Sequence, residues 1–344
     1  MPDSETFTPT EIWTPETAEP AFDDVIEKAR YDMNSQNPEE LISKLNKKVD
    51  RSEDGIVYAV LNGNSPDEHR QYSQKDALVM FNPFANTATA NMLVRSEFIR
   101  LAAKEANVRD EVGRFKPVVM LAAPGLHGSR LKLSKDEKKL VRKGDLGPVA
   151  QEYLKTVRGL KFGHIALLGY SQGADLALSG AQEAYSAQLD AGVMSMGDPA
   201  GVENRGLKPL AQDFYDAAPD LEARAARSGL AALDKARGVR ADYSRFVASM
   251  LYPNNWYRIA AALGSNTFEA NMQAVIDRGD IDKIVVAYGS RSTISPPRAV
   301  EPALARLKGK VRDNRLTSIR VEGGTHAWGE DLTLLAKLYL KALI

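Results

Sequence analysis

One segment, residues 165–174 with the sequence IALLGYSQGA, constrains the fold more than any other part of the chain. It opens with four apolar residues, which is typical of a buried strand, and the residues after Gly173 continue at helical spacing. Ser171 is therefore predicted to lie in a sharp turn between a strand and a helix. Gly169 and Gly173 leave room for these two elements to approach closely. The backbone N–H of Gln172 would begin the helix, where the helix dipole favours negative charge.

Strand and helix signals alternate on both sides of this segment. Predicted strands cover residues 55–61, 76–81, 117–123, 191–196, 281–288 and 316–321, and predicted helices cover 89–107, 147–160 and 332–344. This alternation indicates the α/β class, with a mostly parallel central sheet, right-handed crossovers and helices on both faces.

The chain divides into three predicted parts. Residues 1–54 form an extended arm followed by a helical segment, and residues 55–201 with 281–344 form the α/β core. Residues 1–20 hold four prolines and no regular period, so this stretch is either a floppy tail or an arm that docks onto a partner subunit in a homo-oligomer or larger assembly. Residues 202–280 break the alternation and predict a helical insertion, with helices over 210–214, 221–236, 243–251, 256–263 and 268–278.

Composition limits the partners and the compartment. Lys+Arg and Asp+Glu number 45 each in 344 residues, so net charge favours neither a nucleic acid nor a membrane surface as partner. The absence of cysteine excludes disulfides, thiolate metal sites and a cysteine nucleophile. The first residues lack the basic and apolar regions of a signal peptide, and no stretch reaches the about 18 apolar residues of a spanning helix. We therefore expect a cytoplasmic protein without a membrane span.

The G-x-S-x-G pattern around Ser171, with a strand before it and a helix after it, resembles the nucleophile elbow of the α/β-hydrolase fold. The variant GYSQGA is similar to the elbow of cutinase-like esterases, although secreted cutinases would be expected to carry disulfides. The bare pattern also occurs by chance, so its flanking elements carry the resemblance, which extends over about residues 55–344. It implies an esterase-like or lipase-like serine hydrolase without metal or organic cofactor. It also implies that the insertion at 202–280 is a helical cap over the substrate.

A serine at neutral pH needs a base to take its proton, and the base needs an orienting partner. The chain has four histidines, and His326 alone follows the last predicted strand, where this fold presents its base. Gly323 and Gly324 supply a flexible loop before it. His164 precedes the elbow strand and so belongs to the opposite end of the sheet. His326 is the expected base, and a structural histidine is the alternative.

The acid departs from the family pattern. Most members carry it after the strand at 281–288, in a segment like G-x-x-D-x-x-x-P, but here Ser292 stands at the place of the aspartate. Some lipases of this fold take the acid from the end of the preceding strand, and Asp198 matches that place. Asp198 is therefore either the triad acid or a residue that caps the loop into the insertion.

The backbone N–H groups of Gln172 and Phe84 are the candidate oxyanion hole. Family members often carry a His-Gly-Phe-like tripeptide at the second position, where this chain has Asn82, Pro83 and Phe84, and proline has no N–H. The resemblance predicts hydrolysis of a small-molecule carboxylic ester, acyl or lipid-like, through a Ser-His-Asp triad and an acyl-enzyme. A catalytically weak or inactive hydrolase-like module, attached to a larger assembly through residues 1–20, is the alternative. Haloperoxidase, peptidase and thioesterase chemistry also stay open at this point.

Overall fold

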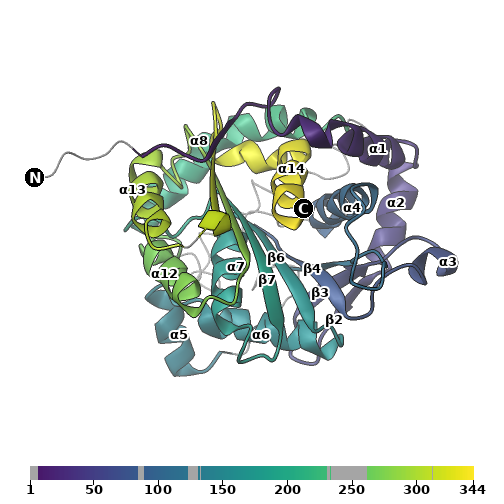
Figure 1. The fold of residues 1–344 in the computed structure, drawn as a ribbon, viewed down its shortest axis with the longest axis horizontal. Coiled ribbons are helices and arrows are strands. Elements are labelled where there is room, and N and C mark those ends of the chain that lie inside the picture. The colour runs from purple at the N-terminus through teal and green to yellow at the C-terminus, as the bar shows by residue number, and fades with distance from the viewer. Residues whose placement is uncertain are drawn as a thin grey trace, which may run out of the picture.

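The computed structural model describes residues 7–83, 89–122, 131, 133–230, 233, 262–311 and 313–344. A nine-stranded sheet runs through this part of the chain (Figure 1). Its strands follow in the order β1 (Glu11–Trp13), β9 (Leu316–Val321), β8 (Lys283–Gly289), β7 (Asp190–Gly197), β6 (His164–Tyr170), β4 (Asp76–Phe81), β5 (Val118–Leu121), β3 (Val57–Leu61) and β2 (Val49–Arg51). Neighbours are parallel except in the pairs β2–β3 and β3–β5. The predicted mostly parallel sheet is confirmed.

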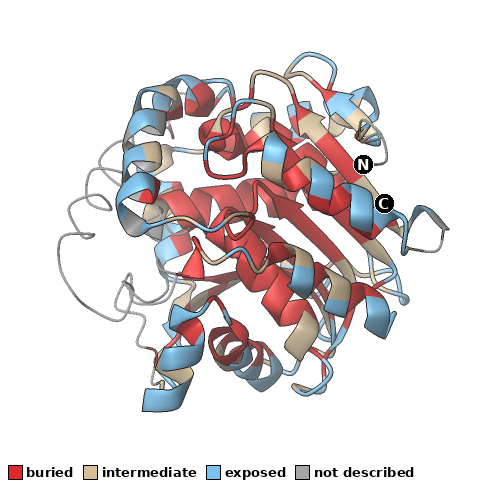
Figure 2. Cartoon of the chain, turned by 90° about the vertical axis from the view of Figure 1, so that its left-hand side faces the viewer, coloured by how far each residue is buried: buried red, intermediate tan, exposed pale blue. Residues whose placement is uncertain are grey.

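Helices cover both faces of the sheet, and the central strands are largely buried between them (Figure 2). Val79 and Phe81 of β4 belong to a core that includes residues of α5 (Lys135–Arg142), α6 (Gly147–Gly159), α7 (Gln172–Glu183), α12 (Phe268–Arg278) and α13 (Pro297–Lys308). Leu78 and Met80 belong to a second core with α1 (Asp23–Asn34), α2 (Pro38–Asn46), α4 (Thr89–Glu105) and α14 (Leu332–Leu343). Successive side chains of a strand point to opposite faces, so one strand serves both cores.

Short helical segments complete the described elements. They are η1 (Pro20–Phe22), α3 (Pro66–His69), η2 (Asp313–Arg315) and η3 (His326–Glu330). The last of these carries the predicted base at its first residue.

The N-terminal arm packs partly on its own chain. Glu11–Trp13 form β1, which pairs in parallel with β9, and the carbonyl of Trp13 accepts from the N–H of Glu322 at 2.7 Å. The Trp13 side chain is buried. No strand was predicted here, because the strand is three residues long and lies in a proline-bearing stretch. The described part of the arm thus adds an edge strand to the sheet, and docking of the arm on a second subunit stays a prediction.

The predicted insertion begins with one long helix. α8 (Leu207–Ala226) runs through Pro219, whereas the sequence predicted a break between two helices there. A proline interrupts the helical hydrogen-bond ladder and commonly ends a helix, which is why the pattern suggested two. α12 occupies the predicted range 268–278 and packs against α7 and α13. The helices predicted over 243–251 and 256–263 lie wholly or mostly outside the described residues.

Two segments of the predicted insertion, residues 204–205 and 264–265, meet at a neck. Asn204 and Ser265 form an isolated antiparallel bridge, and the N–H of Arg205 donates to the carbonyl of Gly264 at 2.8 Å. A Cβ at position 264 would lie 2.2 Å from the carbonyl oxygen of Arg205, so only glycine fits this approach. The chain positions before α8 and before α12 therefore lie side by side. The boundaries predicted for a separate cap stay a prediction.

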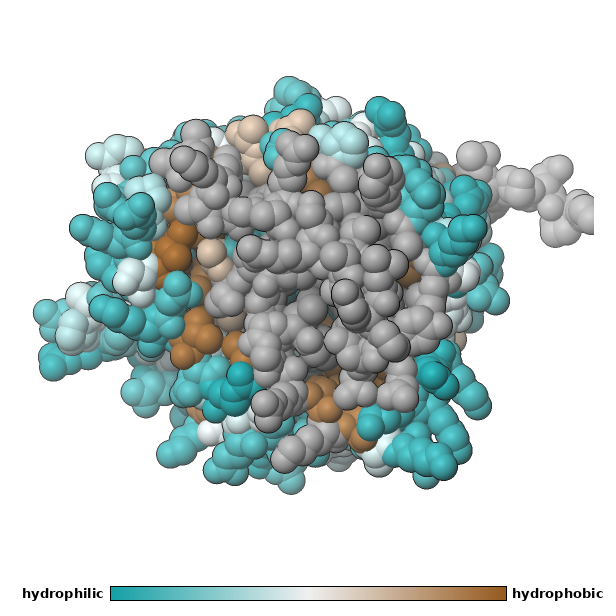
Figure 3. All heavy atoms as spheres, turned by 180° about the vertical axis from the view of Figure 1, so that it is seen from behind, coloured by the Kyte–Doolittle hydropathy of each residue, from teal (hydrophilic) through white to brown (hydrophobic). Residues whose placement is uncertain are grey.

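None of the helices in the described part of the chain is both long and apolar enough to cross a membrane. On the face seen in Figure 3, the described surface is mostly hydrophilic, and hydrophobic residues gather in a few patches.

Candidate active site

Ser171 lies in the predicted sharp turn, between the end of β6 and the start of α7. Its backbone has φ 56° and ψ −128°, a left-handed conformation that is uncommon for a residue other than glycine. A Cβ at Gly169 would lie 2.0 Å from the carbonyl oxygen of Gly173, and one at Gly173 would lie 2.1 Å from that of Phe81. The two glycines therefore let β6, α7 and β4 approach one another, as the spacing in the sequence predicts.

Ser171, His326 and Asp198 form a continuous hydrogen-bonded series. Ser171 Oγ lies 2.8 Å from His326 Nε2, and His326 Nδ1 bonds to Asp198 Oδ2. Their exposed fractions are 2%, 7% and 0%. They follow β6, β9 and β7, so the carboxyl ends of the strands bring together residues that lie up to 155 positions apart in the chain.

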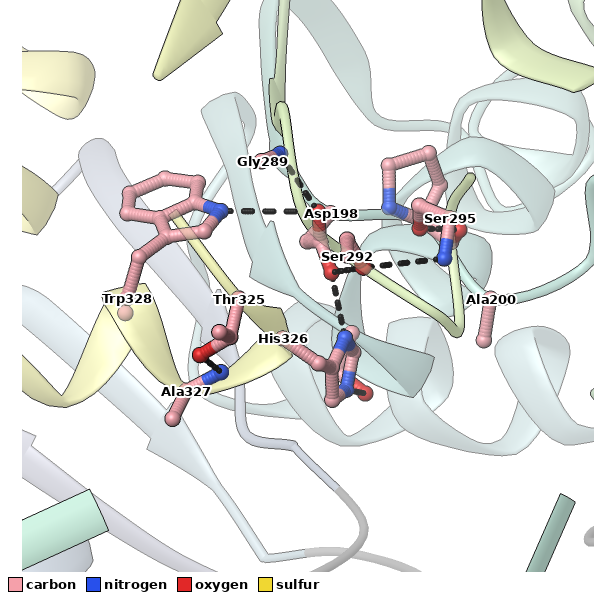
Figure 4. A network of polar contacts seen from close by, with 12 residues as sticks. Asp198, Ala200, Gly289, Ser292, Ser295, Thr325, His326, Ala327 and Trp328 are labelled. Carbon is pink, nitrogen blue, oxygen red and sulfur yellow. Dashed lines mark hydrogen bonds and ion pairs between the residues drawn. The ribbon is translucent and has the colours of Figure 1, made fainter. Parts of the chain in front are cut away.

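The carboxylate of Asp198 accepts from further donors around it (Figure 4). The N–H of Gly289 lies 2.9 Å from Oδ1, the Ser292 hydroxyl lies 2.6 Å from Oδ2, and Trp328 Nε1 lies 3.4 Å from Oδ1. Each donor helps to fix the orientation of the carboxylate toward His326.

Ser292 occupies the position at which most family members carry the acid, and its hydroxyl donates to the carboxylate of Asp198. The same Oγ accepts from the N–H of Ser295 at 3.0 Å, which leaves its proton directed to Asp198. The sequence singled out this position but did not predict the contact, because the contact depends on how the loops after β7 and β8 meet.

Tyr170, the residue before Ser171, holds the segment that carries His326. Its hydroxyl donates to the carbonyl of His326 and accepts from the N–H of Gly329 at 3.0 Å. Its ring stacks on the imidazole with centroids 5.8 Å apart and meets Trp328 edge to face at 5.1 Å. A Cβ at Gly329 would lie 2.3 Å from the tyrosine ring, so this approach requires glycine. The sequence carried no signal for this role.

The far end of η3 is held by a buried ion pair. Arg95 Nη2 of α4 lies 2.5 Å from Glu330 Oε1, and both side chains are buried. Removing one partner of such a pair leaves an uncompensated buried charge, which typically costs about 3–5 kcal/mol.

Asp175 links the helix that follows Ser171 to the loop that follows Asp198. It lies one helical turn after the serine, and its carboxylate accepts from the N–H groups of Ala200 at 3.1 Å and Gly201 at 3.2 Å. Burial raises the pKa of Asp175 to about 7, although the two backbone donors act in the opposite direction.

The structure describes one of the two residues predicted to form the oxyanion hole. Gln172 is the first residue of α7, and the first N–H groups of a helix have no partner within the helix. Asn82 is buried, and its Nδ2 donates to the carbonyl of Leu121 at 3.1 Å. Phe84, the second predicted donor, lies outside the described residues, so its role stays a prediction.

The other described histidines lie elsewhere. His164 is exposed at the start of β6, with Nδ1 3.1 Å from Asp190 Oδ2, and both line a cavity of about 560 Å³ at the opposite end of the sheet. His69 Nε2 contacts the carbonyl of Gly63 at 2.8 Å. Among the described residues, no cluster of three or more His, Asp or Glu side chains is placed to hold a metal ion.

The order of the residues along the chain and their place on the sheet decide the fold. Ser171, Asp198 and His326 follow one another in the chain, and each comes after a strand of a mostly parallel sheet, as in α/β hydrolases. The chain has the α/β-hydrolase fold. In this α/β-hydrolase fold, β1 is an additional edge strand beside the last strand.

No family model matches the sequence, and no curated protein gives a significant match. Solved structures similar to the chain include E-2-(acetamidomethylene)succinate hydrolase, with 15% identity, a TM-score of 0.47, and coverage of 85% of this chain and 97% of that chain. A monoacylglycerol lipase from Paleococcus ferrophilus has 14% identity, a TM-score of 0.44, and coverage of 82% and 99%. The thioesterase domain from the curacin biosynthetic pathway has 16% identity, a TM-score of 0.47, and coverage of 85% and 98%. Likeness at this level says nothing about activity.

Proposed function

We propose that this chain is a serine hydrolase that cleaves a carboxylic ester of an acyl or lipid-like substrate through an acyl-enzyme. The observation that carries the proposal is the buried series from Ser171 Oγ through the imidazole of His326 to the carboxylate of Asp198. A nucleophile within hydrogen-bonding reach of a base, which is itself oriented by an acid, is the arrangement that acyl transfer needs.

In the acylation step, Ser171 Oγ attacks the ester carbonyl carbon while His326 Nε2 takes the hydroxyl proton. The carbonyl oxygen becomes an oxyanion, which the N–H of Gln172 at the start of α7 stabilises. The carbon–oxygen bond to the alcohol then breaks, and the imidazolium donates its proton to the departing oxygen. The acyl group is left on Ser171.

In the deacylation step, His326 Nε2 takes a proton from water as the water oxygen attacks the acyl carbon. The bond to Ser171 Oγ breaks, the proton returns to the serine, and a carboxylic acid is released. Asp198 takes no proton in this scheme. Its role is to hold the Nδ1–H tautomer and to stabilise the imidazolium.

The inactive binding module is less well supported. Two features favour it, the serine at the usual position of the acid and the Asn-Pro in the predicted oxyanion loop. The first loses force because the Ser292 hydroxyl donates to Asp198, which supports position 198 as the source of the acid. Its proposed attachment through residues 1–20 also loses support, because Glu11–Trp13 pair with the chain's own sheet.

Hydrolysis of p-nitrophenyl esters from acetate to palmitate, by wild type beside Ser171→Ala, tests the proposal. We expect turnover that depends on Ser171, with the optimal chain length reporting the size of the acyl site. A fluorophosphonate probe should label wild type and not the variant. Equal rates for the two proteins, together with no labelling, would reject a serine hydrolase.

A further inference from the structure

Helix α8 packs directly against η3, the short helix that begins with His326. The family resemblance assigned the residues of α8 to a cap over the substrate. The contacts of its last turns point instead toward the loop that carries the proposed base.

Two side chains of α8 hold this loop on either side of Gly324. Arg224 Nη2 donates to the carbonyl of Gly323 at 2.6 Å, and the Thr325 hydroxyl donates to Asp220 Oδ2 at 2.5 Å. Arg224 Nε also lies 3.1 Å from Asp220 Oδ2, across one helical turn, so the two anchors support each other.

Burial of Arg224 and the charge of Asp220 favour a fixed contact between these two side chains and the loop. Arg224 is 7% exposed. Burial alone would raise the pKa of Asp220, but hydrogen bonds from Thr325 and Arg224 lower it below its ordinary value, so the carboxylate is ionised and accepts strongly at neutral pH.

The segment after α8 is anchored to the other end of η3. The Ser228 hydroxyl donates to the carbonyl of Glu330 at 3.3 Å and accepts from the N–H of Leu332 at 2.9 Å. Arg30 Nε of α1 donates to the carbonyl of Ser228 at 2.9 Å. The end of α8 is therefore held between α1 and both ends of η3.

The loop itself needs such support. Gly323 has φ +65°, and two successive glycines restrict the backbone less than any other residue pair. His326 follows directly after Thr325, and its Nε2 lies 2.8 Å from Ser171 Oγ. A displacement of about 1 Å would take this contact beyond hydrogen-bonding range, and such misplacement costs on the order of a hundredfold in rate.

We infer that α8 sets the position of the proposed base, and that Asp220 and Arg224 are positioning residues which fix residues 323–325. This inference rests on the proposed function for its effect on turnover. The first helix of the insertion is then part of the support of His326, and a movement of this helix would be transmitted to the imidazole.

The test compares Arg224→Gln and Asp220→Ala with wild type, and uses Lys208→Gln, at an exposed lysine in the first turn of the same helix, as the matched control. We expect kcat for the best p-nitrophenyl ester to fall by about 10- to 100-fold in both test variants, with KM within about twofold. Arg224→Lys keeps a cationic donor for the carbonyl of Gly323 and should recover most of the loss. Lys208→Gln should behave as wild type.

Amide hydrogen exchange over residues 323–330 gives a readout that does not need turnover. We expect faster exchange there in Arg224→Gln and Asp220→Ala than in wild type and Lys208→Gln, at similar thermal midpoints. Unchanged exchange and unchanged kcat in folded Asp220→Ala and Arg224→Gln would overturn the inference, as would an equal loss in Lys208→Gln. Wild type that hydrolyses no ester would reject the proposed function, and the exchange data would still decide whether α8 holds the loop.

Discussion

Replacing Asp175 with asparagine removes a buried carboxyl group that titrates in the neutral range. Its pKa is raised from the ordinary 3.8 to about 7, mainly by burial. Between these two values the folded chain keeps a proton that the unfolded chain releases. The carboxyl group therefore contributes stability that is fully present below about pH 4 and is lost as the pH rises through 7.

The difference between the two pKa values, about 3 units, corresponds to about 4 kcal/mol over the whole range at about 1.36 kcal/mol per unit. Two of these three units lie between pH 5 and pH 7. Over that range the contribution of Asp175 to the free energy of unfolding therefore falls by about 3 kcal/mol. Asparagine does not titrate, so Asp175→Asn should lack this part of the pH dependence. Asparagine also loses one of the two backbone hydrogen bonds, but this loss is the same at both pH values and cancels in the comparison.

The assay is urea unfolding of wild type and Asp175→Asn at pH 5 and pH 8. From pH 5 to pH 8, the free energy of unfolding should fall by about 3 kcal/mol more in wild type than in the variant. Asp136→Asn, at a side chain that is 89% exposed, is the control and should follow wild type. Parallel pH dependence in wild type and Asp175→Asn would refute the raised pKa and with it the argument from burial.

Further outcomes concern the proposed catalytic series and the turn. Ser171→Ala and His326→Ala should each abolish ester turnover, and the double variant should be no worse than either single one, because the two residues act as a unit. Asp198→Asn should lower kcat by on the order of ten-thousandfold with an unchanged circular dichroism spectrum, and wild-type turnover there would remove it as the acid. Ser292 Oγ lies 2.6 Å from the oxygen that contacts the imidazole, so Asp198→Ala combined with Ser292→Asp should recover at least about tenfold over Asp198→Ala alone in a kinetic assay. Gly173→Ala would place a Cβ 2.1 Å from a carbonyl of β4, and we expect it to yield little folded protein by size-exclusion chromatography, whereas normal yield and turnover would contradict the close approach.

Much of the sheet could be predicted because its signals are local. The strand at 76–81, the strand at 316–321 and the helix at 268–278 have the predicted bounds. Ser171 and His326 could be placed at one edge because each follows a predicted strand, and parallel strands present their carboxyl ends together. Local sequence pattern and sheet topology were therefore sufficient to predict most strands and the positions of these two residues.

Other features depend on contacts that a single segment does not reveal. β1 is three residues long and exists as a strand through its pairing with β9. α13 (Pro297–Lys308) begins with proline and was not predicted. Pro219 suggested a break that α8 does not make, and the contacts of its last turns with η3 and α1 help to hold this helix. The roles of Tyr170 and Ser292 likewise come from partners far away in the sequence.

The neck at Asn204 and Ser265 also bears on how such a chain can change over evolution or by engineering. Residues 204 and 265 pair in an antiparallel bridge. A segment of another length could therefore replace the residues between them with little added cost in loop-closure entropy. A graft at this junction would leave the strands untouched. Any replacement for α8 would still have to provide a donor for the carbonyl of Gly323 and an acceptor for the hydroxyl of Thr325.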